Sequence, residues 1–209
     1  MKVELLSVTQ DAEKLIESAG RTAYLSFEKQ KEGSERAFIR MLVRRGHLSV
    51  LEHACATFRV TGGSRAFTHQ LVRHRLCSYT QQSQRYVDEG SFHQIEPDSI
   101  MSNREAHKVF ARFMRYSRSV YSKLQELGVR NEDARFVLPN AVESQIVITA
   151  NFREWRHIIE LRGRPEAQWE VRKMAIEVLR LLRSHAPTVF GDFEINDNKD
   201  VIEKNRYNT

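Results

Sequence analysis

The sequence holds few of the residues that shape disulfide-rich, fibrous or membrane-spanning proteins. Only two of its 209 residues are cysteine, which excludes a disulfide framework and favours reduced thiols at Cys55 and Cys77. With nine glycines and four prolines, the chain is neither collagen-like nor of low complexity. No apolar run reaches the roughly 20 residues that span a bilayer, and the first residues lack the apolar core of a signal peptide. We therefore expect a globular, cytoplasmic protein.

The sequence also lacks the short motifs that mark common catalytic and nucleotide-binding sites. It contains no GxxxxGK[ST] loop and no GxGxxG after a strand, so any phosphate group must be bound by side chains rather than by a glycine-rich main chain. HExxH, paired CxxC and GxSxG motifs are absent as well. His47, Glu52 and His53 do not share a helix face, so we predict no metal site.

Arginine dominates the positive charge of the chain. The 33 Lys+Arg residues exceed the 27 Asp+Glu residues by six, and arginine outnumbers lysine. The planar guanidinium group suits bidentate contact with phosphate, so this excess indicates a phosphorylated ligand. A basic nucleic-acid-binding module without catalysis is the alternative, supported by a row of cations at Arg104, Lys108, Arg112, Arg115 and Arg118.

The hydrophobic spacing predicts an α+β fold in one domain, residues 1–209, with a C-terminal tail from about residue 190. We expect a mixed or antiparallel sheet flanked by long helices. Strands are predicted over 2–8, 54–63 and 143–150, and helices over 9–26, 34–47, 64–75, 102–128, 151–163 and 165–187, with a short helical turn in 131–139.

Capping residues set the predicted ends of these helices. We expect Ser34, Ser64, Ser102 with Glu105, and Asn151 with Glu154 at helix starts, and Gly46, Gly128 and Gly163 at helix ends; Pro165 opens the last helix, and Gly62–Gly63 forms a turn after a strand.

The segment RHRLCSYTQQSQRY, residues 73–86, holds an unusual density of polar groups. Successive helical residues point about 100° apart, so Arg73, His74 and Arg75 cannot all grip one small anion, although they can surround an extended ligand. Cations that offset a helix dipole are the plainer alternative for these three residues. The polar run 78–85 that follows suits either a solvent-facing edge strand or the ribose, base and phosphate of a nucleotide.

Five blocks in this order resemble the flavin-dependent thymidylate synthase family. RHR followed by Ser83 and Arg85 is similar to the signature of that family. The blocks RGHLSVLEHACATFRV, ARFVLP, NFREWRHIIELR and EAQWEVR extend the resemblance from about residue 20 to 185.

The resemblance implies an FAD-dependent methyltransferase that converts dUMP to dTMP. The methylene group would come from 5,10-methylenetetrahydrofolate and the reducing equivalents from NADPH through FAD. A homotetramer with active sites built from several chains is also implied, with no nucleic-acid or membrane partner.

The same resemblance assigns roles to individual residues. Arg162 would act on the uracil ring, where a fixed guanidinium group stabilises developing negative charge. A last-turn cation that complements the helix dipole is the alternative for Arg162. The residues implied to bind FAD are Ser49, Arg73, His74, Arg75, Gln81, Asn151, Arg153 and His157. Those implied to bind dUMP are Gln70, Arg73, Gln81, Gln82, Ser83, Gln84, Arg85, Arg135 and Arg162, with Arg85 and Arg135 as phosphate anchors.

Some positions carry no expected chemical role or depart from the family pattern. Cys77 has no base to activate its thiol, and Ser83 is expected to donate a hydrogen bond rather than to attack. Glu166 stands where a histidine is expected, and its charge would repel a phosphate. Trp155 and Trp169 are expected in the core or an interface rather than against the flavin.

Overall fold

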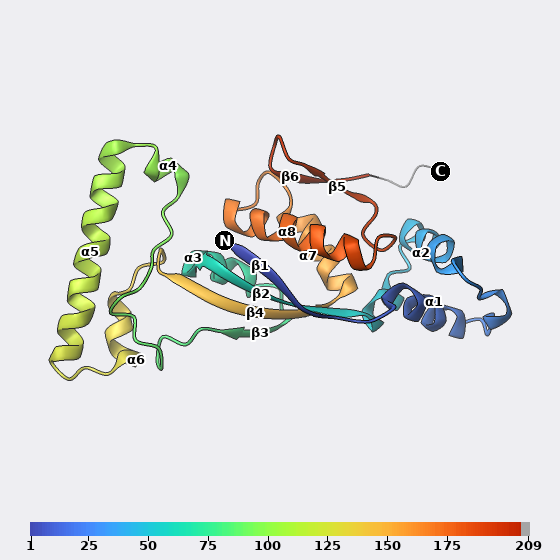
Figure 1. Cartoon of the computed structure of the whole chain (residues 1–209), viewed down its shortest axis with the longest axis horizontal. Helices are drawn as coiled ribbons and strands as arrows, with labels where there is room; N and C mark the ends of the chain where they lie inside the picture. Colours follow the sequence, from blue (N-terminus) through green and yellow to red (C-terminus); the bar gives the residue numbers. More distant parts are fainter. Residues whose placement is uncertain (206–209) are drawn as a thin grey trace. The chain divides into compact units, whose positions relative to one another are not determined.

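Eight α-helices and six strands make up the part of the chain that the computed structural model describes, residues 1–205 (Figure 1). The helices are α1 (Ala12–Thr22), α2 (Ser34–Arg45), α3 (Arg65–Leu71), α4 (Asp98–Met101), α5 (Arg104–Glu126), α6 (Asn131–Ala134), α7 (Phe152–Arg162) and α8 (Trp169–His185). The strands are β1 (Lys2–Val8), β2 (Cys55–Ser64), β3 (Ser78–Gln81), β4 (Glu143–Asn151), β5 (Phe193–Asn196) and β6 (Val201–Lys204). Three 3-10 turns complete the set: η1 (Phe27–Lys29), η2 (Ser49–His53) and η3 (Arg135–Val137). The α+β class is confirmed.

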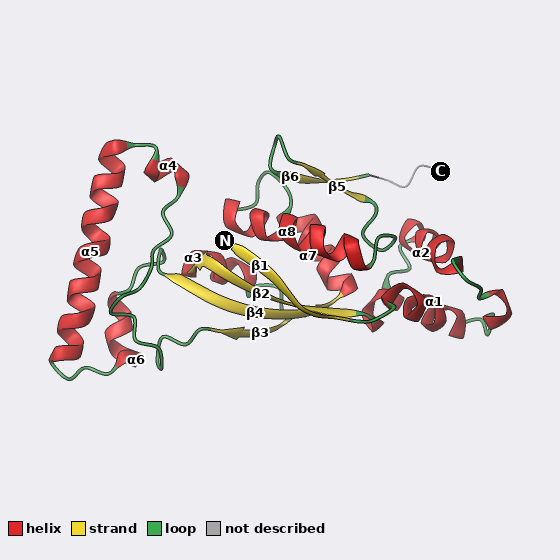
Figure 2. Ribbon diagram, in the orientation of Figure 1, coloured by secondary structure: helices red, strands yellow, loops and turns green. Residues whose placement is uncertain are grey.

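The strands form two sheets (Figure 2). The larger has the order β1-β2-β4-β3, so β2 and β4 are its central strands. Alternate residues of β4 are buried, as expected for a strand with one face on a core. The smaller sheet is the antiparallel pair β5 and β6, with Phe193 opposite Lys204 and Asn196 opposite Val201.

The described chain divides into two compact units. The α5 unit comprises residues 1–2, 61–71 and 80–146, and the α7/α8 unit comprises residues 3–60, 72–79 and 147 onward. The boundaries fall within the strands of the larger sheet, so each unit holds part of every one of these strands. The expectation that residues 1–209 form one domain stays a prediction.

Trp155 belongs to the core of the α7/α8 unit. It is fully buried, its ring meets Phe58 edge-on with centroids 5.0 Å apart, and its indole N–H donates to the main-chain oxygen of Ala56. Helix α8 adds a buried face that includes Met174, Val178 and Leu182. A ring enclosed in this way cannot stack on a cofactor, which confirms the expectation for Trp155.

An ion pair joins α7 to the segment that precedes β5. Both Nη atoms of Arg156 lie 2.6 Å from the carboxylate oxygens of Asp192, and Nη1 also donates to the main-chain oxygen of Val189. Both side chains are buried, and the guanidinium carbon lies 4.7 Å from the centre of the Phe193 ring. The bidentate geometry satisfies two charges that would otherwise be costly to bury.

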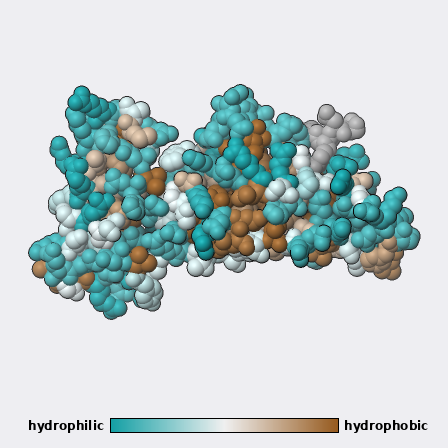
Figure 3. All heavy atoms as spheres, viewed as in Figure 1, coloured by the Kyte–Doolittle hydropathy of each residue, from teal (hydrophilic) through white to brown (hydrophobic). Residues whose placement is uncertain are grey.

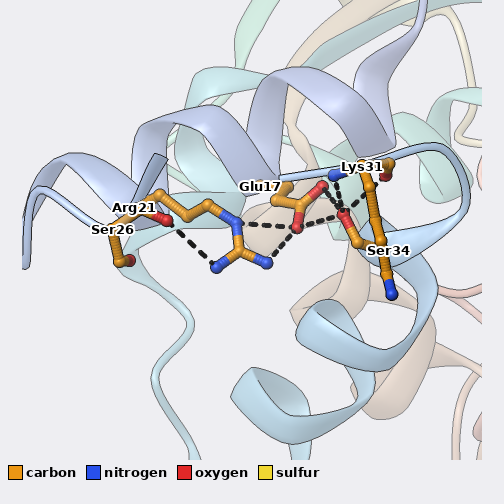
Figure 4. Close-up of polar contacts among 5 residues, drawn as sticks. All are labelled: Glu17, Arg21, Ser26, Lys31 and Ser34. Carbon is orange, nitrogen blue, oxygen red and sulfur yellow. Dashed lines mark hydrogen bonds and ion pairs between the residues drawn. The ribbon is translucent and has the colours of Figure 1, made fainter. Parts of the chain in front are cut away.

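Helices α1 and α2 meet through a buried carboxylate (Figure 4). Glu17 accepts two hydrogen bonds from Arg21 and one from the hydroxyl of Ser34. Ser34 is therefore engaged by Glu17 and by the main chain of Lys31, and Gly33, with φ 78°, occupies the N-cap position instead. The prediction that Ser34 caps α2 is wrong because the Glu17 carboxylate binds its hydroxyl.

Helix α5 buries only part of its apolar face. Met114, Ser117 and Tyr121 are buried, whereas Val109 and Phe113 are 67% and 53% exposed. Figure 3 shows mainly hydrophilic side chains over this helix, with single hydrophobic ones between them.

Two predicted helix starts are displaced to residues whose side chains accept main-chain N–H groups. The side chain of Asn103, not Ser102, accepts the main-chain N–H groups at the start of α5. Helix α8 begins at Trp169, with Gln168 as its cap, rather than at Pro165. The main-chain oxygens of Pro165 and Ala167 instead accept from the guanidinium of Arg172. The caps predicted at Ser64 and Asn151 are confirmed.

Two further predictions are wrong because tertiary contacts override local signals. Strand β2 continues through Gly62, whose φ of 71° and lack of a side chain allow Met1 to approach; a Cβ there would lie 3.1 Å from Met1 Cα. Helix α3 ends at Leu71, so residues 73–75 lie beyond it in a turn that buries His74. The tail after residue 190 contains the β5–β6 hairpin, and Ile202 N donates to the main-chain oxygen of Gly163 there.

No helix within residues 1–205 is both long enough and apolar enough to cross a membrane.

Candidate functional site

The RHR segment of the α7/α8 unit presents two arginines outward and one histidine inward. Arg73 and Arg75 are exposed, whereas His74 is only 5% exposed. The hydroxyl of Tyr79 donates to the main-chain oxygen of His74 at 3.0 Å. This hydrogen bond holds the main chain of the segment in place. Because exposed and buried residues alternate, Arg73 and Arg75 face the surface and His74 faces the interior.

Both ring nitrogens of His74 face residues of helix α7 or its end. Nε2 lies 2.9 Å from Nε of Arg162, and Nδ1 lies 3.4 Å from Oε1 of Glu154. The ring of His157 stands edge-on to that of His74, with centroids 5.7 Å apart. Because a guanidinium group only donates, Nε2 of His74 is the acceptor and carries no proton in this contact.

The surroundings of His74 hold its imidazole neutral. Burial, followed by the charges of Arg162 and His157, lowers the pKa of His74 to about 4. Burial and the neighbouring Arg73 likewise lower the pKa of Arg162, while Tyr79 opposes the shift. At neutral pH, the pair is therefore a guanidinium cation donating to a neutral imidazole.

Glu154 is the carboxylate of this group, and its side chain is 8% exposed. Burial raises its pKa, and the charges of His157 and Arg153 oppose that shift. Its main-chain N–H donates to the side chain of Asn151, which caps α7. The sequence indicated Glu154 only as a capping residue, and no local signal places its carboxylate against His74.

Two hollows on the α7/α8 unit adjoin these residues. One, of about 450 Å³, is lined by Arg73, His74, Arg75, Leu76, Glu154 and His157. The other, of about 620 Å³, is lined by Leu48, Glu52, Leu76, Asn151, Arg153, Glu154, Arg156, His157, Glu160 and Lys204. Both volumes lie in the range of ligand pockets. Leu76, Glu154 and His157 line both hollows.

The structure brings most of the candidate cofactor residues of the sequence to these two hollows. Arg73, His74 and Arg75 line the smaller one, Asn151 and Arg153 the larger, and His157 both. Arg153 forms an ion pair of 2.6 Å with Glu52, so its charge is already partly offset. Ser49 lines neither hollow; it is exposed at the start of η2, the turn that carries Glu52.

One ligand atom each from His74, Glu154 and His157 could enclose a metal ion, since these atoms lie within 4.8 Å of one another. The arginines disfavour such an ion. The lone pair of His74 Nε2 already accepts from Arg162. The positive charge of Arg73 acts on Arg162 and that of Arg153 acts on Glu154, and these cations would repel a metal ion. The absence of a metal stays a prediction.

In the α5 unit, an amide network holds the polar residues at the end of β3 and just after it. The side chain of Gln81 donates to the hydroxyls of Thr68 and Ser144, at 3.0 and 3.1 Å. Gln82 donates to the carboxylate of Glu89, which is buried and has a raised pKa because of that burial. Gln81 was expected to bind both FAD and dUMP. Its contacts with Thr68 and Ser144 place its side chain in the α5 unit, which also holds most of the candidate nucleotide residues.

The candidate phosphate anchors Arg85 and Arg135 both meet Glu132. Nη2 of Arg85 lies 3.1 Å from the Glu132 carboxylate, and Nε of Arg135 donates to the Glu132 main-chain oxygen at 3.0 Å. Of the other nucleotide candidates in this unit, Gln84 is buried, Ser83 is half-buried with its hydroxyl accepting from Arg85 N, and Gln70 is exposed on α3.

Arg65 is a cation of this unit that the sequence analysis missed. Burial and the charge of Arg135 lower its pKa, while Glu89 opposes the shift. A cation in the first turn of a helix opposes the helix dipole, and this unfavourable position was the available sequence signal. Because the charges of Arg65 and Arg135 repel each other, an anion bound beside them would relieve that repulsion.

Cys77 is not an activated nucleophile. Burial raises the pKa of its thiol to about 11, and the charge of Glu154 adds to that shift. The hydrogen bond with Tyr79 only partly opposes it. The thiolate that attack requires is therefore scarce at neutral pH, in agreement with the sequence analysis.

Comparison with known proteins places the chain in a family. The model of the family described as "Thymidylate synthase complementing protein" matches residues 4–188. A flavin-dependent thymidylate synthase of Geobacter sulfurreducens is 44% identical over 200 residues, covering 92% of this chain and 86% of that protein. A Corynebacterium glutamicum protein of the same name is 41% identical over 210 residues, covering 92% of this chain and 84% of its own length.

Solved structures show the same fold. The flavin-dependent thymidylate synthase ThyX from Helicobacter pylori, crystallised with FAD and dUMP, superposes with a TM-score of 0.78 at 22% identity. The superposition covers 92% of this chain and 99% of that one. Every candidate residue named above lies within the range that the family model matches.

Proposed function

Because this chain belongs to the flavin-dependent thymidylate synthase family, we propose that it converts dUMP to dTMP by reductive methylation. The carbon donor is 5,10-methylenetetrahydrofolate, and NADPH supplies the reducing equivalents through FAD. The match over residues 4–188, which contains all the candidate residues, is the observation that carries the proposal.

The residues around the two hollows fit a flavin dinucleotide. The smaller hollow offers two exposed guanidinium groups, Arg73 and Arg75, and the imidazole of His157. Cations suit the pyrophosphate, and the half-buried side chain of Asn151 offers amide hydrogen bonds. When bound, FAD supplies the two-electron chemistry of the reduction. Glu166 lies exposed beyond α7, and its negative charge would repel the flavin pyrophosphate.

Arg162 is proposed to act on the pyrimidine. C5 of uracil becomes nucleophilic as negative charge builds in the ring, and a fixed cation beside a ring carbonyl stabilises that charge as it develops. The contact from Nε of Arg162 to His74 occupies one edge of the guanidinium and sets the plane of the group. Fixing that plane in advance spares the reorganisation that solvent or a mobile side chain would require.

The polar run of the α5 unit is proposed to bind the nucleotide itself. Arg135 and Arg85 would bind the phosphate, and Gln70, Gln82, Ser83 and Gln84 would supply hydrogen bonds to the nucleotide. The repulsion between Arg65 and Arg135 supports an anion at this place and makes Arg65 a further candidate for it. Because Glu132 already pairs with Arg85, phosphate binding there must compete with or adjoin a carboxylate.

We further propose a cytoplasmic homotetramer with active sites built from several chains. The exposed Val109, Phe113 and Tyr116 on α5 support burial of that helix in an assembly. The cationic face of α5 includes Lys108, which pairs with Glu105, and Arg118, which donates to the main-chain oxygen of Phe92. Two of its five cations thus have partners within the chain, which weakens the nucleic-acid alternative.

The test begins with the visible spectrum of the purified protein, to which dUMP is then added. Bound FAD should give the absorption bands of an oxidised flavin, and dUMP should perturb them. With NADPH and 5,10-methylenetetrahydrofolate, the protein should form dTMP, while Arg162→Lys should retain FAD and lose about 100-fold in kcat. A protein that takes up no FAD and binds nucleic acid with a strong salt dependence would contradict the proposal.

A further inference from the structure

The carboxylate of Glu154 lies where it can decide the proton position on His74. Glu154 Oε1 is 3.4 Å from Nδ1, on the side of the imidazole away from the Arg162 contact. A neutral imidazole carries its proton on one nitrogen only, and the hydrogen-bond partner of one nitrogen sets the state of the other. An acceptor at Nδ1 therefore favours the tautomer in which Nε2 is bare.

Helix capping does not account for this position of Glu154. The N-cap of α7 is the side chain of Asn151, which accepts from Glu154 N at 2.9 Å. The carboxylate is buried at 8% side-chain exposure and faces His74, so it bears a desolvation penalty that capping would not require.

We propose that Glu154 is a positioning residue for the reaction: it holds His74 as the Nδ1–H tautomer, so that Nε2 accepts from Arg162 and fixes the guanidinium that faces the pyrimidine. This inference rests on the proposed function of Arg162. The opposite tautomer would set an N–H against an N–H at a separation of 2.9 Å and would turn Arg162 away.

The other charged and titratable groups near Glu154 do not accept a hydrogen bond from Nδ1 of His74. Arg153 and His157 lie on the same helix, and Cys77 and Tyr79 come from the segment after His74. Arg153 is paired with Glu52 at 2.6 Å. Burial raises the pKa values of Cys77 and Tyr79, so both stay protonated. Among the described groups that face the His74 ring, Glu154 is the carboxylate that can accept the Nδ1 proton.

The test combines nitrogen NMR with kinetics on the full-length protein with FAD bound. Histidine-labelled wild-type protein should show His74 with a protonated Nδ1 and a bare Nε2, the signal being assigned by its loss in His74→Gln. Glu154→Leu should shift the signal toward Nε2–H and lower kcat about 10- to 100-fold, as loss of an orienting partner does at other imidazoles. The KM for dUMP should change little, because Arg162 acts on charge that develops after binding.

Two matched variants separate positioning from a structural effect. Glu154→Gln keeps an oxygen acceptor and should retain most of the wild-type tautomer and kcat. Glu177→Gln removes a partly exposed carboxylate of α8, paired with Arg180, and should behave as wild type. Equal losses in Glu154→Gln and Glu154→Leu with an unchanged His74 signal would overturn the proposal.

The wild-type spectrum also tests the proposal without any variant. A wild-type His74 that carries its proton on Nε2 would refute the positioning role even if Glu154→Leu fails to fold. Failure of the proposed function would show separately, as a wild-type protein that forms no dTMP.

Discussion

Arg162 donates its Nε–H group to Nε2 of His74 over 2.9 Å, so a cation is held against an imidazole that remains neutral. The contact joins the last residue of α7 to the middle of the RHR segment, 88 residues away in the chain. Neither residue could keep this contact if His74 were protonated, since both partners would then be donors. Acid should therefore act on the fold and on this site together.

Stability should fall in mild acid partly through His74. Its folded-state pKa, about 4, lies below the 6.5 of an unperturbed histidine, so between these values the unfolded chain binds a proton that the folded chain does not. The stabilisation that comes from keeping His74 neutral is complete above pH 6.5 and is lost as the pH falls toward 4. Between pH 7 and pH 5, the free energy of unfolding should drop by about 2 kcal/mol from this group.

Urea unfolding at the two pH values measures this effect. His74→Gln retains a hydrogen-bond acceptor for Arg162 but no titrating ring, so its stability should change less between pH 7 and pH 5 than that of the wild type. His185→Gln, at the exposed end of α8, is the control and should show the full wild-type difference. An equal loss in His74→Gln and wild type would show that His74 does not titrate as its surroundings indicate.

Cys77 should be unreactive and dispensable for chemistry. Its raised pKa of about 11 leaves little thiolate, whereas Cys55 is exposed and provides a comparison within the same chain. Iodoacetamide at pH 8 should modify Cys55 first, as peptide mass spectrometry can follow, and Cys77→Ser should keep kcat within about threefold. Loss of turnover in Cys77→Ser without loss of FAD would restore a covalent role for this thiol.

The sequence predicted the elements of the fold more accurately than their ends. Apolar periodicity identified β4 and α7, because one buried face imposes a regular spacing on the chain. The end of α3 and the cap of α2 were wrong because they depend on partners distant in sequence: His74 meets Arg162, and Ser34 meets Glu17. Propensity carries no information about such contacts.

The sequence likewise predicted some residues of the candidate site and missed others. Family blocks identified residues by type and order, and the structure brings His74 close to both His157 and Arg162. Glu154 and Arg65 were missed, since a glutamate at a capping position and an arginine at a helix start both have ordinary local explanations. Only the folded chain shows that Glu154 faces His74 and that Arg65 lies near the charge of Arg135.

The buried Arg156–Asp192 pair should be a large local contributor to stability. Removing one partner leaves the other charge buried, so Asp192→Asn should lower the free energy of unfolding by about 3 kcal/mol. The exposed pair Arg180–Glu177 provides the comparison, and Glu177→Gln should change stability by less than about 1 kcal/mol. Urea denaturation with a common m-value measures both; similar small losses would mean that water reaches Asp192.

Arg135 should recognise the phosphate of the substrate rather than its base. Arg135→Gln removes the charge but keeps a donor that can reach the main-chain oxygen of Glu132, the present partner of Nε. Because a charge-assisted contact with phosphate is lost, the Kd for dUMP should rise about 10- to 100-fold. Deoxyuridine lacks the phosphate, so its weak binding should be unchanged in the variant.

Titration of the flavin spectrum with each ligand measures this difference. Arg112→Gln, which removes an exposed cation of α5, is the control for net charge and should bind both ligands as the wild type does. If Arg135→Gln weakens dUMP and deoxyuridine equally, Arg135 supports the architecture of the α5 unit and does not contact phosphate. If Arg112→Gln weakens dUMP as much as Arg135→Gln does, the attraction is a long-range effect of net charge, and the salt dependence of the two variants should then coincide.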